Sequence, residues 1–291
     1  MPRAANKNEM ESREFRMRDS DFRTIVEAIY AHAGIVIGDH KRELVYSRLA
    51  RRLRRLGLSD FETYLARFDG PAGAEERDHL INALTTNHTH FFRESHHFDH
   101  VRDVAVKHWQ ERAAKTGDRK IRIWSAGCSS GEEPYSLAMT LADALGRSAG
   151  WDWKILATDI DTNVLDDARR GEYPKGAVRD VPKRLQSAYL KNSAPDGSMV
   201  RVQESAKSHL VFNRLNLHGA WPMKGQFDLI FCRNVTIYFD GPTKNKLVKR
   251  FAENLKPDGW LYLGHSESVL GGTAGLQPVG RTIYSCNGKA R

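Results

Sequence analysis

The chain has 291 residues, of which 40% are hydrophobic and 28% charged, a composition typical of a soluble globular protein of one or two domains. No apolar run approaches the roughly 20 residues of a membrane span, and the polar N-terminus lacks the apolar core of a secretory signal. The three cysteines lie far apart without a CxxC motif, so we expect reduced thiols, a cytoplasmic location and no zinc site. The net charge of +9 favours anionic partners without choosing among them.

The N-terminal part of the chain is predicted to be helical. After a flexible, charged tail over residues 1–18, helical patterns fill residues 19–94 and form one small module. Its first helix is expected to have Ser20 as the N-cap and to end at Gly34. A later helix is expected to start with Ser59 as its N-cap.

A row of arginines marks the second helix of this module, LVYSRLARRLRRL, at residues 44–56. Their i, i+3, i+4, i+7 spacing places them on one helix face, while the apolar residues face elsewhere and can pack. Composition leaves two interpretations open, a solvated helix face or a docking surface for an acidic helix or for phosphates. The arginines of this stripe are Arg48, Arg51, Arg52 and Arg55.

From about residue 119 the pattern changes to strands that alternate with helices. Apolar runs predict buried parallel strands at 121–124, 153–159, 227–232 and 260–265, and helices are expected at 134–145, 162–169 and 242–255. The alternation predicts a doubly wound α/β sheet with a ligand at the carboxyl ends of its strands. Between them MVRVQ and HLVFNRL alternate like antiparallel strands, which predicts a small inserted β excursion.

The segment IRIWSAGCSSGEEPYSL, residues 121–137, predicts a strand, a loop of small residues and a helix. Such a turn suits a nucleotide-like ligand, although a tight strand-to-helix turn needs no ligand. Glu132 and Glu133 disfavour a phosphate here, because the N-terminus of a helix binds anions best without nearby negative charge. The ligand is therefore expected to be cationic or to offer ribose hydroxyls.

Two further segments place polar residues at the ends of predicted strands. Asp159 follows the second strand, where a carboxylate commonly binds a ribose diol. It could instead cap the next helix, but Asp161 is the better cap. Arg233 and Asn234 emerge from a buried strand, as ligand-facing residues do.

Five segments, in order, resemble the signatures of the CheR family, the S-adenosylmethionine-dependent methyltransferases that esterify glutamates on the cytoplasmic helices of chemoreceptors. They are TTNHTHFFRE (85–94), SAGCSSGEEPYS (125–136), ATDIDTNVL (157–165), FCRNVTIYF (231–239) and LKPDGWLYLGHSES (255–268). The resemblance covers essentially the whole chain after the tail. It implies a class I methyltransferase domain at 95–291, with a small antiparallel β subdomain at about 172–214, preceded by a receptor-docking helical domain at 19–94.

The resemblance also implies roles for individual residues. Arg93 and Tyr238 match the family's proposed catalytic pair near the sulfonium methyl group. Glu133 is similar to the carboxylate that faces the methionine part of the cofactor, and Asp159 to the acid that binds the ribose. The other positions that match cofactor contacts are Asn87, Thr89, Arg93, Asn216, Leu217, Arg233 and Asn234, of which Asn216 and Leu217 lie against the adenine in the family.

The partners follow from the same resemblance: S-adenosylmethionine as methyl donor, S-adenosylhomocysteine as product and glutamate-rich receptor helices as substrate. We expect a monomer without nucleic-acid binding, membrane insertion or a metal, although histidines crowd residues 88–100. Some relatives bind a receptor tail peptide at the β subdomain by adding a strand. The connection KNSAPDGS lacks the closely spaced glycines expected of that type, so peptide binding stays open. A different methylation substrate and a non-catalytic cofactor sensor remain as alternatives.

Overall fold

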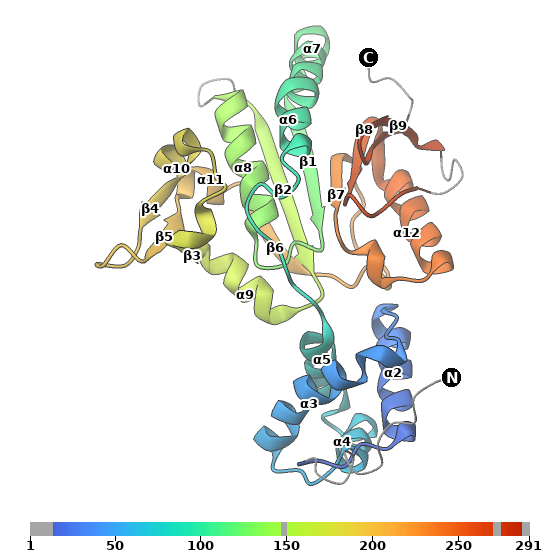
Figure 1. Cartoon of the computed structure of the whole chain (residues 1–291). Coiled ribbons are helices and arrows are strands. Elements are labelled where there is room, and N and C mark those ends of the chain that lie inside the picture. The colour runs from blue at the N-terminus through green and yellow to red at the C-terminus, as the bar shows by residue number, and fades with distance from the viewer. Residues whose placement is uncertain (1–13, 147–149, 270–274, 287–291) are drawn as a thin grey trace. The chain divides into compact units, whose positions relative to one another are not determined.

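The computed structural model describes residues 14–146, 150–269 and 275–286 (Figure 1). Contacts divide the chain into two compact units, Met1–Thr86 and Asn87–Arg291. The division falls between Thr86 and Asn87 rather than at residue 94, so the segment 87–94 belongs to the larger unit.

The smaller unit is helical within its described residues, as predicted. Its apolar core includes Ile29 of the first helix and Leu49 of the arginine helix, both fully buried. Gly34 and Gly57 end these two helices in the left-handed conformation that glycine adopts without strain. The elements are α2 (Asp19–Ala33), η1 (Asp39–Lys41), α3 (Arg42–Leu56), α4 (Phe61–Ala66), η2 (Arg67–Asp69) and α5 (Gly73–Leu84).

Both predicted serine caps are wrong. Ser20 lies inside α2, whose start is held by Asp21, since this carboxylate accepts a hydrogen bond from the backbone N–H of Arg18 at 2.7 Å. Asp60, the neighbour of Ser59, caps α4 by accepting a backbone N–H from its first turn at 2.8 Å. In each case a carboxylate next to the serine makes the stronger, charge-assisted bond.

The larger unit is built on a seven-stranded sheet of order β6-β2-β1-β7-β8-β10-β9. The first five strands in this order run parallel, and β10 is antiparallel to both β8 and β9. This confirms the predicted doubly wound sheet. The strands are β1 (Lys120–Ala126), β2 (Asp152–Asp159), β6 (Leu210–Arg214), β7 (Phe227–Cys232), β8 (Leu255–Leu263), β9 (Gln277–Gly280) and β10 (Ile283–Ser285).

Helices cover both faces of the sheet, which explains why its central strands are apolar runs. Trp109 and Leu141, from α7 and α8, pack with Ile123 and Phe231 of the sheet in one apolar cluster. On the other face, where Figure 1 shows α12, Phe251 of that helix packs in a second cluster. These helices are α6 (His96–His100), continued by the π-helical turn η3 (Val101–Ala105) and α7 (Val106–Thr116), α8 (Glu132–Leu145), α9 (Thr162–Arg170) and α12 (Gly241–Asn254).

The β excursion is smaller than the segment predicted for it. β3 (Glu172–Pro174), β5 (Met199–Val202) and β4 (Leu190–Asn192) form a three-stranded antiparallel sheet beside η4 (Lys175–Val178), α10 (Lys183–Tyr189) and α11 (Glu204–Lys207).

The prediction that HLVFNRL is an antiparallel strand is wrong. This segment forms β6, which pairs in parallel with β2 from Leu210 to Arg214 and so belongs to the main sheet. β6 is the edge strand of that sheet, and Val211 keeps 48% of its surface exposed. A half-exposed edge strand alternates in polarity as a hairpin strand does, which explains the error. No helix in the described part of the chain combines the length and apolar character needed to cross a bilayer.

Candidate functional site

The carboxyl ends of three neighbouring strands define the candidate site. Ala126 of β1 pairs with Thr158 of β2, and Ser125 of β1 pairs with Phe231 of β7. The loops that leave these strands therefore start side by side at one edge of the sheet, which is where ligands bind in open α/β sheets.

The loop after β1 is tied down by backbone bonds. The N–H groups of Gly127 and Cys128 both donate to the carbonyl oxygen of Thr158, at 2.8 and 2.9 Å. Gly127 has φ 82°, and a Cβ there would lie 2.4 Å from Cγ2 of Val235 in the loop after β7. Only glycine meets both the left-handed backbone and the close approach.

Asp159 is buried at the end of β2 and is held by the backbone. Its Oδ2 accepts the N–H of Ser129 at 2.8 Å, and its Oδ1 accepts the N–H of Asp161 at 3.0 Å. Burial raises the pKa of Asp159 above that of an ordinary aspartate. Asp161 caps α9 through the N–H of Asn163 at 2.9 Å, so the prediction that it is the better cap is confirmed.

Asn87 joins the two loops. Its Nδ2 donates to Oδ2 of Asp161 at 2.7 Å, and its carbonyl oxygen accepts the hydroxyl of Ser129 at 2.9 Å. Thr89 follows it and is half-buried. The first predicted cofactor segment thus begins beside the glycine loop, although Asn87 and Ser129 are 42 positions apart in the sequence.

Arg233 is the central cation of the site, with 2% of its side chain exposed. Its Nη1 donates to Oε2 of Glu133 at 3.3 Å, and its Nη2 lies 3.5 Å from Oε2 of Glu94 and donates to the carbonyl oxygen of Arg93. Glu133 also accepts the hydroxyl of Ser125 at 2.7 Å. Burial raises the pKa of Glu133 although Arg233 opposes the shift.

The carboxyl of Glu94 behaves in the opposite way. Burial acts to raise its pKa, but Arg233 and hydrogen bonds from His265 outweigh burial and hold the pKa below the ordinary value. The backbone N–H and Nδ1 of His265 each lie 3.2 Å from Oε1 of Glu94. Glu94 therefore links the segment that carries Arg93 to the strand ends of β7 and β8.

Arg93 lies between two strained residues. Phe92 has φ 54° and Glu94 has φ 56°, a region that non-glycine residues seldom adopt and that costs about 1–3 kcal/mol per residue. The half-buried Arg93 side chain donates from Nη1 to the carbonyl oxygen of His88 at 2.9 Å. The other predicted catalytic residue, Tyr238, is half-buried at the end of the 3-10 turn η5 (Thr236–Tyr238).

Asn216 and Leu217 follow the edge strand β6 and lie close to the end of β2. The N–H of Leu215 donates to the carbonyl oxygen of Asp159 at 2.9 Å. Asn216 accepts the N–H of His218 through Oδ1 at 2.9 Å, and Leu217 is buried. Predicted residues from separate stretches of the chain are therefore joined by contacts at this edge, among them Asn87, Glu133, Asp159 and Arg233.

Glu267 is a buried residue of this region for which the sequence predicted no role. Its carboxylate accepts the backbone N–H groups of four consecutive residues, 234–237, and that of Gly264, besides the hydroxyl of Thr236. The available signal was an acidic residue shortly after an apolar strand, in the segment LGHSES. The sequence also predicted no role for Glu94. Most partners of both glutamates are distant in the sequence, so local patterns do not reveal them.

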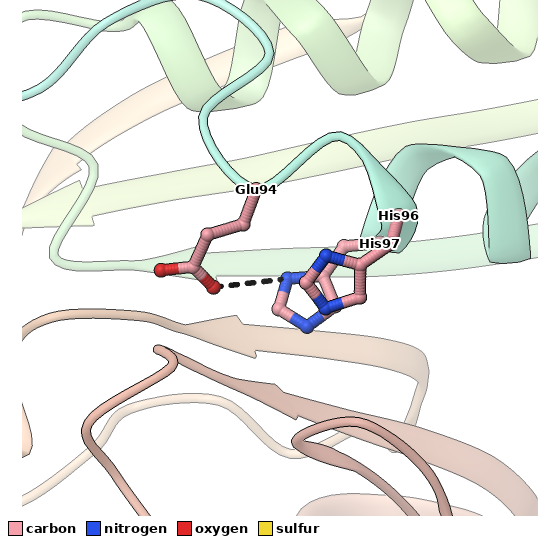
Figure 2. Close-up of side chains that lie close together, drawn as sticks. All are labelled: Glu94, His96 and His97. Carbon is pink, nitrogen blue, oxygen red and sulfur yellow. Dashed lines mark ion pairs between the residues drawn. The ribbon is translucent and has the colours of Figure 1, made fainter.

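Glu94, His96 and His97 form a cluster next to this network (Figure 2). Nδ1 of His97 lies 3.6 Å from Oε2 of Glu94, and burial lowers the pKa of His97 to about 3, so its ring is neutral near pH 7. Potential ligand atoms of the three residues lie within 4.8 Å of one another. The same Glu94 oxygen faces Arg233, however, and a metal cation there would meet the guanidinium charge. The absence of a metal stays a prediction.

The arginine stripe of the smaller unit separates into two pairs. Arg48 donates from Nη1 to the carbonyl oxygens of residues 83 and 85, the latter at 2.7 Å, and Arg52 forms an ion pair with the buried Glu76. Arg51 and Arg55 are exposed. Only the second pair is therefore displayed to solvent as a docking surface requires.

The chemistry of the site fits a ligand with a cationic group and hydroxyls. The edge of the sheet carries three carboxylates, Glu133, Glu94 and Asp159, against the two guanidinium groups of Arg233 and Arg93. Each oxygen of Glu133 has one protein partner described above, and Asp159 accepts backbone hydrogen bonds from Ser129, Ile160 and Asp161, so both carboxylates can accept further hydrogen bonds. S-adenosylmethionine offers an ammonium group and a ribose diol, which match these acceptors.

Two family models match the chain. The model of the CheR methyltransferase SAM binding domain matches residues 87–284, and that of the CheR methyltransferase all-alpha domain matches residues 20–85. A chemotaxis protein methyltransferase of Salmonella typhimurium is 44% identical over 271 residues, which cover 92% of this chain and 91% of that relative. A chemotaxis protein methyltransferase 2 of Pseudomonas aeruginosa is 43% identical over 276 residues, with coverages of 94% and 95%. The similarity extends over both units.

Proposed function

The chain belongs to the CheR family of S-adenosylmethionine-dependent chemotaxis methyltransferases, and we propose that it methylates glutamate side chains of chemoreceptors to form methyl esters. The product of the methyl donor is then S-adenosylhomocysteine. The observation that carries the proposal is the pair of acidic groups, Glu133 and Asp159, at the carboxyl edge of the sheet: Glu133 pairs with Arg233, and Asp159 is held by the backbone of the glycine loop.

We assign the binding of the methyl donor to the residues of this edge. Glu133 would pair with its ammonium group, and Asp159 would accept hydrogen bonds from its ribose. When bound, the donor supplies an activated methyl group on a positively charged sulfur. The remaining contacts are assigned to Asn87, Thr89, Arg93, Asn216, Leu217, Arg233 and Asn234.

A glutamate substrate suits a site without a strong base. Its carboxylate is already ionised near neutral pH, so no proton has to be removed before it attacks. The protein must instead align the reactants, and good alignment can supply roughly 7–11 kcal/mol of the barrier. We assign this alignment to Arg93, which can hold a carboxylate through two parallel hydrogen bonds, and to the hydroxyl of Tyr238.

The exposed part of the arginine stripe supports an acidic partner. Arg51 and Arg55 lie one turn apart on α3, where their charges can meet glutamates along a receptor helix. The smaller unit would then select the receptor while the larger unit carries out the transfer. We place this reaction in the cytoplasm and expect the chain to act as a monomer.

Transfer of a labelled methyl group to receptor-containing membranes tests the proposal. We expect label on the receptors that is released by mild base, as a methyl ester is, and no label with an Asp159→Asn chain. An Asp228→Asn chain, which alters another buried aspartate of the same unit at the other end of β7, serves as the matched active control. Base-stable label, or label on nucleic acid, would overturn the assignment to glutamate.

Receptor tail peptides are a separate question for the three-stranded sheet. β5 is its central strand, so a peptide strand would have to add to β3 or β4 at an edge. The turn before β5 contains Gly197 but no closely spaced glycines. Titration of the chain with receptor tail peptides decides whether this edge binds them.

A further inference from the structure

Glu267 organises the loop that leaves β7. Its Oε2 accepts the backbone N–H groups of Asn234 and Gly264 at 2.8 and 2.6 Å. Its Oε1 accepts those of Val235, Thr236 and Ile237, at 3.0, 2.6 and 3.2 Å, and the Thr236 hydroxyl at 2.8 Å. Glu267 is 1% exposed, so these hydrogen bonds take the place of the bonds that its carboxylate would make to water.

Only a carboxylate can satisfy this set of donors. Each oxygen accepts at least two hydrogen bonds, and every partner is a donor. A glutamine has one amide nitrogen that carries its own hydrogens, and in either orientation this nitrogen would face two or more N–H groups. Glu267→Gln therefore changes the loop while almost preserving the size of the side chain.

The loop held in this way carries residues of the proposed active site. Asn234, at φ 59°, follows Arg233, and the 3-10 turn that starts at Thr236 ends at Tyr238. Gly264 allows the close approach, because a Cβ there would lie 2.6 Å from Nδ2 of Asn234. The position of Tyr238 thus depends on the backbone that Glu267 binds.

Of the residues assigned to the cofactor, Asn234 hydrogen-bonds to Glu267, whereas the two acidic groups that carry the assignment have other supports. Glu133 is held by Ser125 and Arg233, and Asp159 by the glycine loop. We infer that Glu267 is a positioning residue for methyl transfer, which acts through Tyr238 more than through cofactor binding. The inference rests on the proposed function, because it takes Tyr238 as a residue that orients the reactants.

The test compares Glu267→Gln with Asp228→Asn in the full chain. Asp228 is also 1% exposed and accepts bonds from Arg112, Lys256 and the backbone N–H of Arg122, but it lies at the other end of β7. For Glu267→Gln we expect kcat to fall at least about tenfold, while the Kd of S-adenosylhomocysteine changes less than about threefold. Asp228→Asn should lower the unfolding temperature but leave kcat of the folded fraction within about twofold.

Hydrogen exchange provides a readout that does not depend on activity. Amides 234–237 should exchange faster in Glu267→Gln and at the wild-type rate in Asp228→Asn. If Glu267→Gln does not fold, Thr236→Val removes one bond and should lower kcat about threefold.

Three outcomes would overturn the inference. The first is an unchanged kcat in Glu267→Gln despite faster exchange, and the second is an equal loss of kcat in the two variants. A wild-type chain that forms no receptor ester would overturn both the proposed function and the inference, whereas the first two outcomes leave the proposed function standing.

Discussion

Arg233 and Glu133, 100 positions apart in the sequence, meet at the edge of the sheet with Nη1 and Oε2 3.3 Å apart. Arg233 also faces Glu94, so one buried cation compensates two carboxylates. With Asp159 and Arg93 counted as well, this edge of the sheet carries one more carboxylate than guanidinium groups, a charge that the proposed ammonium ligand would balance.

Removal of the Arg233 charge should destabilise the fold. Arg233→Met leaves Glu94 and Glu133 without their common partner, and loss of one member of a buried ion pair typically costs about 3–5 kcal/mol. Denaturant unfolding measures this change. Arg102→Met, which breaks the exposed pairs with Asp99 and Asp103, should cost no more than about 1 kcal/mol. Equal costs for the two variants would contradict the prediction.

Cofactor affinity should fall on acidification. Burial raises the pKa of Glu133 above its ordinary 4.5, although Arg233 acts against the shift, so protonation begins at a higher pH than for a free glutamate. A protonated Glu133 has no charge for the ammonium group, and Asp159 changes in the same direction. Calorimetric titration with S-adenosylhomocysteine between pH 8 and pH 5 measures the effect. Glu133→Gln should bind more weakly and with a flatter pH profile; a wild-type slope in this variant would argue against the assignment.

The free energy of unfolding should also decrease as the pH is lowered, because His97 is buried in its neutral form. Burial lowers the pKa of His97 from 6.5 to about 3, so the unfolded chain binds more protons between these values. The contribution of neutral His97 to the free energy of unfolding is fully present above pH 6.5. It decreases as the pH falls and is smaller by about 2 kcal/mol at pH 5. Unfolding of His97→Asn should lose this part of the pH dependence. The exposed His32 provides the control, since His32→Gln should keep the wild-type slope.

Charge reversal on α3 should separate docking from folding. Arg51→Glu with Arg55→Glu should lower receptor methylation at least about fivefold at low salt, because both side chains are exposed. The affinity for S-adenosylhomocysteine should not change. Arg23→Glu with Arg54→Glu, two exposed arginines of the same unit outside the stripe, changes the net charge by the same amount and is the control. Unaltered methylation by the double variant would rule out this docking surface.

Arg52→Glu on the same stripe should behave differently. It would place a like charge against the buried Glu76, and the cost should appear in the unfolding temperature of the smaller unit. Differential scanning calorimetry measures it. If Arg52→Glu keeps the wild-type unfolding temperature but lowers receptor methylation, Arg52 belongs to the docking surface instead.

The sequence predicted the parts of this protein that depend on local pattern. Apolar runs located β1, β2, β7 and β8, and Gly34 and Gly57 marked helix ends because their signals lie within a few residues. It failed where the answer depends on distant partners. HLVFNRL alternates like a hairpin strand, but its neighbour in the sheet is β2, some fifty residues earlier, as the pairing of Ile155 with Leu210 shows.

The same distinction applies to the site. Arg48 and Arg52 belong to the stripe by spacing, yet their partners on or after α5 decide their role, and spacing cannot reveal them. Glu267 had no apparent function in the sequence, because its partners become visible only when the loop after β7 folds over it.

The contact between Gly127 and Val235 also has a consequence for motion. Val235 packs against Gly127, and its own backbone N–H is fastened to Glu267, so opening of either loop alone would separate Val235 from Gly127. Any microsecond-to-millisecond exchange at the edge of the sheet should therefore be concerted. Relaxation dispersion would then report one common rate for the amides of both loops, and the methyl donor would enter a site whose two sides move as one body.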